Sequence, residues 1–267
     1  FKFTSSDRVQ EVLQVLQILR EPTEVNYVDS VKEYNTGTRP REILIFCLHM
    51  AFSKQDQIYQ TGEVNASKHV MDMFYHYGAD RIAAIDPHVP PDFPWAQELI
   101  KQRRFVIVSM SEQIVSEILQ GHNMGDVFLV STPGKRRTHL GIELTEIDKE
   151  RVSTHRVDLT GRVDEKIRGK SVFMLDDMVI SGTTIRGARR MFLNQGARDV
   201  NCWVTHALPL APADGSPANE DNLRSLVAEF EKKIFVSNTV RTITFEKENV
   251  YCMWSCGPTV IKFLKST

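Results

Sequence analysis

A chain of 267 residues is long enough to form two α/β domains rather than a single small one. Its formal net charge is −1 and its lysines and arginines are scattered, which argues against a nucleic-acid-binding protein. No run approaches eighteen apolar residues and the first six residues lack the apolar core of a secretory signal, so we expect neither a membrane span nor export. The four cysteines form no Cys-x-x-Cys pair and are expected to be buried thiols in a cytoplasmic protein.

Helical and strand patterns alternate along the chain. Apolar residues three and four positions apart predict helices over residues 8–19, 65–77, 111–119, 184–195 and 222–232. Uninterrupted apolar runs predict strands over residues 43–48, 81–85, 105–108, 127–130, 172–175, 200–204 and 233–236. Such runs are typical of strands covered on both faces, as in a parallel sheet. Two of the helices end in Gly-Ala before a strand, which indicates two related α/β lobes. The boundary between them is expected near residues 101–105, where a charged run precedes a new strand.

One segment combines the features of a sugar-phosphate site. An apolar run over residues 172–175 precedes an Asp-Asp pair, two apolar residues, and then Ser-Gly-Thr-Thr at the start of a helix. The apolar run predicts a strand that ends before the aspartates, which then lie at its carboxyl edge. Ligands of open parallel sheets bind beyond the carboxyl ends of strands. Glycine allows a tight turn there, main-chain amides at a helix start bind anions, and the carboxylates suit ribose hydroxyls. The candidate ribose 5-phosphate ligands are Asp176, Asp177, Ser181, Gly182, Thr183 and Thr184.

The alternative interpretation of this segment is an ordinary strand–turn–helix in which the aspartates cap the helix. An acidic pair alone would not decide between the two. The combination of strand, acidic pair and hydroxyl-rich turn in one register favours the ribose 5-phosphate site.

Residues 172–184 resemble the signature of type I phosphoribosyltransferases and phosphoribosyl pyrophosphate synthetases. Three other segments resemble the synthetases specifically. Residues 52–57 are similar to their nucleotide-binding segment, residues 77–88 to a Gly-Ala-Asp-Arg segment that ends in histidine, and residues 148–151 to their catalytic flexible loop. The matches keep their order along almost the whole chain, which is therefore similar to the ribose-phosphate diphosphokinase family.

The resemblance implies an α/β fold of two phosphoribosyltransferase-like lobes with mostly parallel, doubly wound sheets. Residues 1–103 would form the nucleotide-side lobe, incomplete at its start, and residues 104–267 the ribose-phosphate-binding lobe. The implied reaction transfers a pyrophosphoryl group from ATP to ribose 5-phosphate, with Mg²⁺ as cofactor. The resemblance also implies a homo-oligomer, formed alone or with a homologous subunit.

The resemblance further assigns roles to residues outside the Ser-Gly-Thr-Thr turn. The implied residues are Lys149, Arg151 and His88 for catalysis, His88 also for the metal, and Lys54, Gln55 and Asp56 for ATP. Each has an ordinary alternative: the histidine could bond backbone in a proline-flanked loop, and residues 148–151 could be a solvated charged turn. Their joint order along the chain favours the functional assignment.

Two other functions remain open. A phosphoribosyltransferase would consume phosphoribosyl pyrophosphate, but it has no use for a second nucleotide lobe. A non-catalytic regulatory homologue is favoured by two departures from the synthetases: residues 131–134 lack their carboxylate, and their early nucleotide-reaching segment is missing. Lys54 also stands where the synthetases carry arginine, which gives up the planar fork of donors.

Overall fold

The computed structural model describes most of the chain in two compact units, Phe1–Val108 and Ser109–Thr267. The described residues are 6–28, 31–58, 60–89, 93–110, 113–116, 120, 124–131, 145–146, 149–151, 157–159, 167–208, 220–230, 234–240 and 251–266. Among them, no helix is both long and apolar enough to cross a membrane. Each unit is built on a parallel sheet, as the uninterrupted apolar runs predict.

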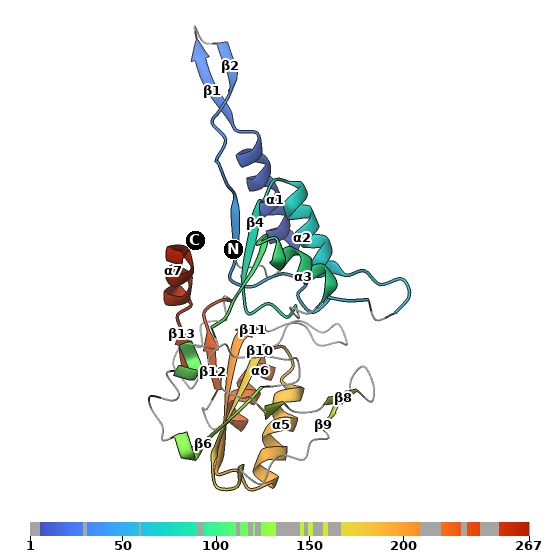
Figure 1. The fold of residues 1–267 in the computed structure, drawn as a ribbon, viewed down its shortest axis with the longest axis vertical. Coiled ribbons are helices and arrows are strands. Elements are labelled where there is room, and N and C mark those ends of the chain that lie inside the picture. Colours follow the sequence, from blue (N-terminus) through green and yellow to red (C-terminus); the bar gives the residue numbers. More distant parts are fainter. Residues whose placement is uncertain are drawn as a thin grey trace. The chain divides into compact units, whose positions relative to one another are not determined.

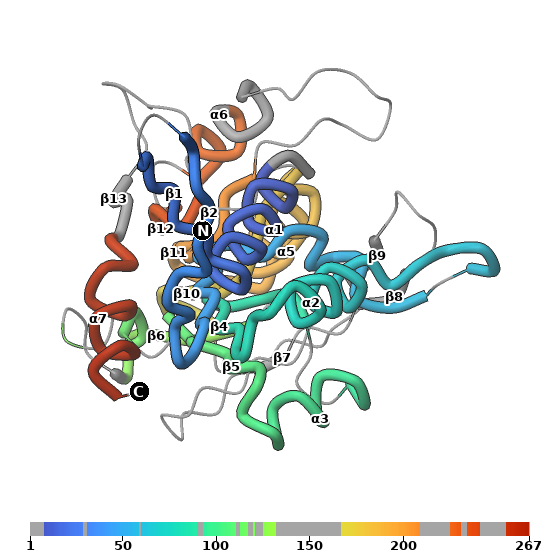
Figure 2. Tube along the Cα trace, turned by 90° about the horizontal axis from the view of Figure 1, so that it is seen from above, coloured from blue at the N-terminus to red at the C-terminus, as the bar shows by residue number. Residues whose placement is uncertain are grey.

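The first unit contains a three-stranded parallel sheet in the order β3-β4-β5. Its strands are β3 (Leu44–Cys47), β4 (Arg81–Ile85) and β5 (Phe105–Val108), and its helices are α1 (Ser6–Arg20), α2 (Ala66–His76) and α3 (Pro94–Lys101). Helices α1 and α2 lie side by side (Figure 1 and Figure 2), and residues of all three helices join the strands in one apolar core. Because β5 pairs with β4, the unit ends after Val108 and not after Arg103, where the sequence suggested a boundary.

A two-stranded antiparallel ribbon separates α1 from β3. Strands β1 (Thr23–Val28) and β2 (Val31–Thr36) pair along their whole length, and every residue in them is exposed. The ribbon extends beyond the end of α1 (Figure 1), and a hydrogen bond from the Gly37 N–H to the Pro22 carbonyl closes its base at 2.7 Å. The apolar runs in the sequence do not indicate this ribbon.

The second unit contains a six-stranded, wholly parallel sheet in the order β13-β12-β11-β10-β6-β7. Its strands are β6 (Val127–Ser131), β7 (Thr145–Glu146), β10 (Ser171–Val179), β11 (Asp199–Ala207), β12 (Ile234–Ser237) and β13 (Tyr251–Trp254). Its other elements are the 3-10 turn η1 (Met124–Asp126), the antiparallel pair β8 (Lys149–Arg151) and β9 (Val157–Leu159), and the helices α5 (Thr183–Asn194), α6 (Glu220–Glu229) and α7 (Gly257–Ser266). Residues of α5 and α6 pack with β10, β11 and β12 in one apolar core.

The expected Gly-Ala helix stops are confirmed in both units. After α2, the N–H of Ala79 donates to the Phe74 carbonyl at 2.9 Å; after α5, the N–H of Ala197 donates to the Phe192 carbonyl at 3.1 Å. The intervening glycines have φ of +108° and +91°. This is the Schellman arrangement, which satisfies the last helix carbonyls and turns the chain into the next parallel strand. The likeness of the two halves therefore has a structural counterpart.

The remaining predicted elements agree with the structure to varying degrees. All seven predicted strands are present, whereas α3, α7, β13 and the short strands β7, β8 and β9 were not predicted. Of the helix expected over residues 111–119, residues 113–116 are helical and the others lie outside the described residues.

Three of the four cysteines are free and buried, as expected: Cys47, Cys202 and Cys256. Burial raises the pKa of the Cys47 thiol from its ordinary value of 9.0 to about 12. Burial also raises the pKa of Cys202, and the nearby Asp176 carboxylate adds to that rise. Both thiols should therefore resist alkylation in the folded protein, since the thiolate is the reactive form.

This burial predicts a loss of stability in alkali. Above pH 9.0 the unfolded chain releases the Cys47 proton while the folded chain retains it, so the unfolded state gains stability until the folded pKa near 12 is reached. Urea unfolding at several pH values should show a free energy of unfolding that falls from pH 9 upward. The fall should be smaller in Cys47→Ala; an identical pH dependence in the variant would contradict the assignment.

Candidate functional site

The expected sugar-phosphate segment lies at the carboxyl end of the larger sheet, but the strand is longer than predicted. β10 does not end at Leu175; it continues through both aspartates to Val179. The reason is β11, which pairs with β10 in one constant register as far as Val179 and Ala207, whereas β6 pairs with it only as far as Leu175. Asp176 and Asp177 therefore lie within the strand, beyond the last β6 pairing among the described residues.

Both aspartates are half-buried, so they are not sealed in the core. The Asp177 N–H donates to Asp176 Oδ1 at 2.9 Å, and the Met178 N–H donates to Asp177 Oδ1 at 2.8 Å. These bonds hold each carboxylate against the main chain of the following residue. A carboxylate that accepts one local N–H keeps lone pairs for other donors, such as sugar hydroxyls.

The turn that follows β10 presents hydroxyl groups to solvent. Ser181 and Thr183 are exposed, Thr184 is half-buried, and the hydroxyls of Ser181 and Thr183 lie 3.0 Å apart. Gly182 is the N-cap of α5 and has φ of +73°. The first-turn amides of a helix have no intrahelical acceptor. Among the described residues, the acceptor found for them is the Ser181 hydroxyl, 3.4 Å from the Thr183 N–H, so the turn retains the amides and hydroxyls of an anion site.

A buried polar network braces the neighbouring strand ends. His206 Nδ1 lies 2.8 Å from Thr239 Oγ1, and the Thr239 hydroxyl donates to the Thr205 carbonyl at 3.0 Å. The Ser237 hydroxyl donates to the same carbonyl and lies 2.7 Å from Thr239 Oγ1. These four residues are at most 1% exposed and tie the end of β11 to the turn after β12. Satisfied buried networks of this kind rigidify the scaffold beside a site.

The expected nucleotide residues occupy the first unit. Lys54 and Gln55 are exposed, and the Gln55 carbonyl accepts the Ser67 N–H at 3.1 Å, which fixes the loop to the start of α2. Asp56 is only 3% exposed, and its main-chain carbonyl accepts a hydrogen bond from the Asn65 side-chain amide. Asp56 is therefore buried within the loop, whereas Lys54 and Gln55 reach solvent.

Five of the described polar residues are buried in this unit, and only one of them, Asp56, was a candidate from the sequence. Among the unit's described residues, the buried polar or charged residues follow β3 or β4 or lie at the start of α2; they are His49, Ser53, Asp56, Ser67 and Asp86. Phe52 and Asp86 also have positive φ, +58° and +37°. Strained backbone and buried polar groups gather at ligand sites, so this edge of the sheet is the best candidate site of the first unit. The signal available in the sequence was position, directly after two predicted strands.

The metal and catalytic residues implied by the resemblance are divided between the two units. His88 follows β4 and is half-buried. Lys149 and Arg151 lie on β8, which pairs with β9 and is not a charged turn. The described residues contain no group of three or more His, Cys, Asp or Glu side chains arranged to hold a metal ion.

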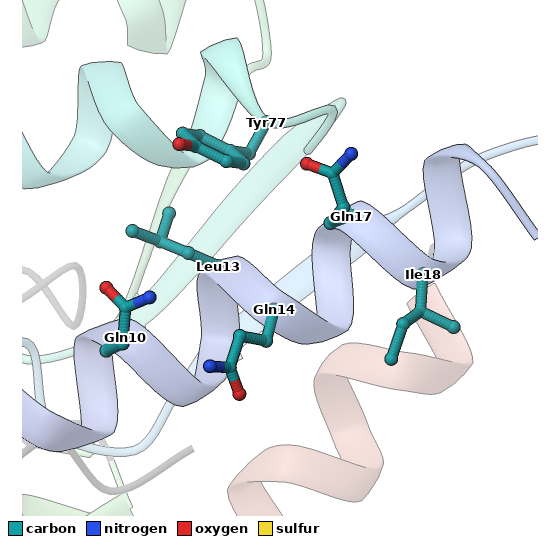
Figure 3. Close-up of a pocket in the computed structure, with 6 residues that line it drawn as sticks. All are labelled: Gln10, Leu13, Gln14, Gln17, Ile18 and Tyr77. Carbon is teal, nitrogen blue, oxygen red and sulfur yellow. The ribbon is translucent and has the colours of Figure 1, made fainter.

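A hollow of about 480 Å³ lies away from these residues, between α1 and Tyr77. Figure 3 shows Leu13 and Gln17 projecting from α1 toward the Tyr77 ring. Its lining carries no charged side chain: Gln10, Leu13, Gln14, Gln17, Ile18 and Tyr77. A phosphate-bearing ligand would find no positive charge there, so we do not assign either substrate to it.

Comparison with known proteins agrees with the resemblance seen in the motifs. A ribose-phosphate pyrophosphokinase of Sulfurisphaera tokodaii is 24% identical over 239 residues, covering 86% of this chain and 77% of that protein. The enzyme of the same name from Bacillus subtilis is also 24% identical, covering 96% and 74%. The chain is therefore similar to ribose-phosphate pyrophosphokinases over most of its length. No protein-family model matches it.

The fold is similar to that of a solved synthetase. The crystal structure of phosphoribosylpyrophosphate synthetase from Mycobacterium smegmatis superposes with a TM-score of 0.64, covering 97% of this chain and 95% of that one. The two sequences are only 16% identical, so this likeness concerns the α/β fold alone. The expected α/β fold with mostly parallel sheets is confirmed.

Proposed function

We propose that the chain transfers a pyrophosphoryl group from ATP to the anomeric hydroxyl of ribose 5-phosphate. The sugar oxygen attacks the β-phosphorus, the bond between that phosphorus and the α,β-bridging oxygen breaks, and AMP leaves as the hydroxyl loses its proton. The products are phosphoribosyl pyrophosphate and AMP. The observation that carries the proposal is the turn at residues 181–184, in which the exposed Ser181 and Thr183 offer hydroxyls next to two half-buried carboxylates.

The residues divide between the two substrates. The turn from Ser181 to Thr184 would hold the 5-phosphate, and Asp176 and Asp177 the ribose hydroxyls, because anions prefer helix starts and hydroxyls donate to carboxylates. Lys54 and Gln55 are exposed and available to ATP, with Asp56 supporting their loop. By resemblance, Lys149 and Arg151 would stabilise charge on the transferred group.

Mg²⁺ fits this proposal as a cofactor held largely by substrate. Magnesium at nucleotide sites takes one or two protein groups, with phosphate oxygens and waters completing its octahedron. By resemblance, His88 would stand on the metal side, where it follows β4 and is half-buried. When bound, the ion would neutralise phosphate charge. The cofactor, the cytoplasmic location and a homo-oligomeric assembly remain predictions.

A non-catalytic homologue that binds phosphates is the second candidate. The burial of Asp56 favours it, because a residue that is only 3% exposed offers almost no surface to a nucleotide unless the loop moves. Both candidates share the ribose 5-phosphate site and differ in whether ATP is turned over.

AMP formation separates these candidates. The protein should convert ribose 5-phosphate and ATP, with Mg²⁺, to AMP and phosphoribosyl pyrophosphate, measured by anion-exchange chromatography. Ribose without its phosphate serves as the control and should give no AMP above background. Ribose 5-phosphate binding without AMP would support the non-catalytic homologue; release of pyrophosphate from phosphoribosyl pyrophosphate and a nucleobase would identify a phosphoribosyltransferase. Absence of binding and of turnover would overturn the proposal.

A further inference from the structure

Arg186, in the first turn of α5, links the exposed turn to helix α6. Its Nη1 donates to the Ser181 carbonyl at 2.8 Å, its Nε to Glu229 Oε1 at 2.7 Å, and its Nη2 to Ser225 Oγ at 2.7 Å. The side chain is 18% exposed. One guanidinium therefore holds the main chain of the turn with one nitrogen and α6 with the other two.

The bond to Ser181 has a geometric consequence. A trans peptide group is planar, so the carbonyl of Ser181 and the N–H of Gly182 point in opposite directions. With the carbonyl fixed on Arg186, the Gly182 N–H points away from the guanidinium. If the peptide plane turned over, a carbonyl oxygen would replace that donor and repel an anion.

Helix α6 supplies the support for this arrangement. A Cβ atom placed on Gly182 would lie 2.9 Å from the Leu226 side chain, so the turn rests directly on α6. Ser225 and Glu229, which bind Arg186, are four residues apart and so share a face of that helix. Leu226 is 1% exposed, which anchors the support in the core.

We propose that Arg186 is a positioning residue for phosphate binding, acting through the peptide between Ser181 and Gly182. It keeps the Gly182 N–H oriented as a donor and itself lies on the opposite side of that peptide. This inference rests on the proposed function, because it concerns the same phosphate site. It goes further in placing part of the affinity on α6 residues that do not touch the substrate.

Calorimetric titration with ribose 5-phosphate tests the proposal. Arg186→Met should weaken binding by about tenfold, because a preorganised donor is lost. Arg186→Lys should bind almost as weakly, since an ammonium keeps the charge but cannot make the three-way contact. The loss should be the same at low and high salt, whereas a direct charge effect would fade with screening. If turnover is present, KM for ribose 5-phosphate should rise by a similar factor, with kcat changing by less than about threefold.

Arg189→Met is the matched control. Arg189 lies on the same helix, with its guanidinium carbon 5.3 Å from the centre of the Phe230 ring. The variant therefore removes the same charge as Arg186→Met, together with a contact between α5 and Phe230, the residue that follows α6. Its affinity should stay within about twofold of wild type. A Ser225→Ala, Glu229→Gln double variant, which leaves α5 and the turn unaltered, should weaken binding about threefold and tests the proposal even if Arg186→Met does not fold.

The outcomes separate the inference from the function on which it rests. Wild-type protein that does not bind ribose 5-phosphate would overturn both. Wild-type protein that binds, with Arg186→Met or Arg186→Lys equally tight, would overturn the positioning role and leave the proposed function standing. A loss that disappears at high salt would overturn it in favour of a direct ionic contact.

Discussion

Replacing Gly182 with alanine is expected to destabilise the protein by about 3 kcal/mol and to remove most of its affinity for ribose 5-phosphate. Two effects add in this variant. The φ of +73° is strained for any residue with a Cβ, at a cost of roughly 1–2 kcal/mol, and the new methyl group would lie 2.9 Å from Leu226. Relief of that overlap must move either the turn or α6. Urea unfolding measures the stability, and titration with ribose 5-phosphate measures the affinity.

Gly169 provides a matched control for that substitution. Its φ is +76°, almost the same as at Gly182, but a Cβ atom placed on Gly169 would meet no other atom within 4 Å. Gly169→Ala should therefore cost only the backbone strain, roughly 1–2 kcal/mol, and leave binding unchanged. Equal losses of stability in the two variants would show that the Leu226 contact is unimportant.

Lys149→Ala is expected to lower kcat for AMP formation by about 10²–10³-fold, because under the proposed function it removes a cation that would stabilise developing charge on the transferred group. Binding of ribose 5-phosphate should change little, since the residues proposed to bind it lie on β10 and the start of α5. Initial-rate measurement of AMP alongside calorimetric titration separates the two effects.

The neighbouring residue on β8 supplies the control. Glu150 lies between Lys149 and Arg151 on β8, where it pairs with Asp158 of β9, and it carries no positive charge. Glu150→Gln should keep kcat within about threefold of wild type. If it lost as much activity as Lys149→Ala, the loss could not be assigned to the Lys149 cation.

The local parts of the sugar-phosphate site were predictable from sequence, and its supports were not. The Ser-Gly-Thr-Thr turn before α5 was predicted because glycine and hydroxyl residues at a helix start are a local pattern. The contacts of Arg186 with Ser225 and Glu229 span 39 and 43 residues. No periodicity or turn signal within a short window reports a pairing of that range.

The errors in the strands have the same physical origin. Asp176 and Asp177 looked like residues that end a strand, because carboxylates are rare within sheets. Pairing with β11 as far as Ala207 overrides that local preference. The β1–β2 ribbon was missed for the opposite reason: its apolar residues are interspersed with polar ones, whereas uninterrupted apolar runs defined the predicted strands.

That ribbon also makes the first unit modular. None of the residues in β1 and β2 is buried. The two ends of the ribbon meet at the hydrogen bond between the Gly37 N–H and the Pro22 carbonyl. Exchanging the ribbon for a short turn would subtract no side chain from the core, and extending it would cost only the slowly growing entropy of a longer loop. The Pro22–Gly37 junction is thus a natural grafting point, where length and composition can change while the α/β scaffold stays intact.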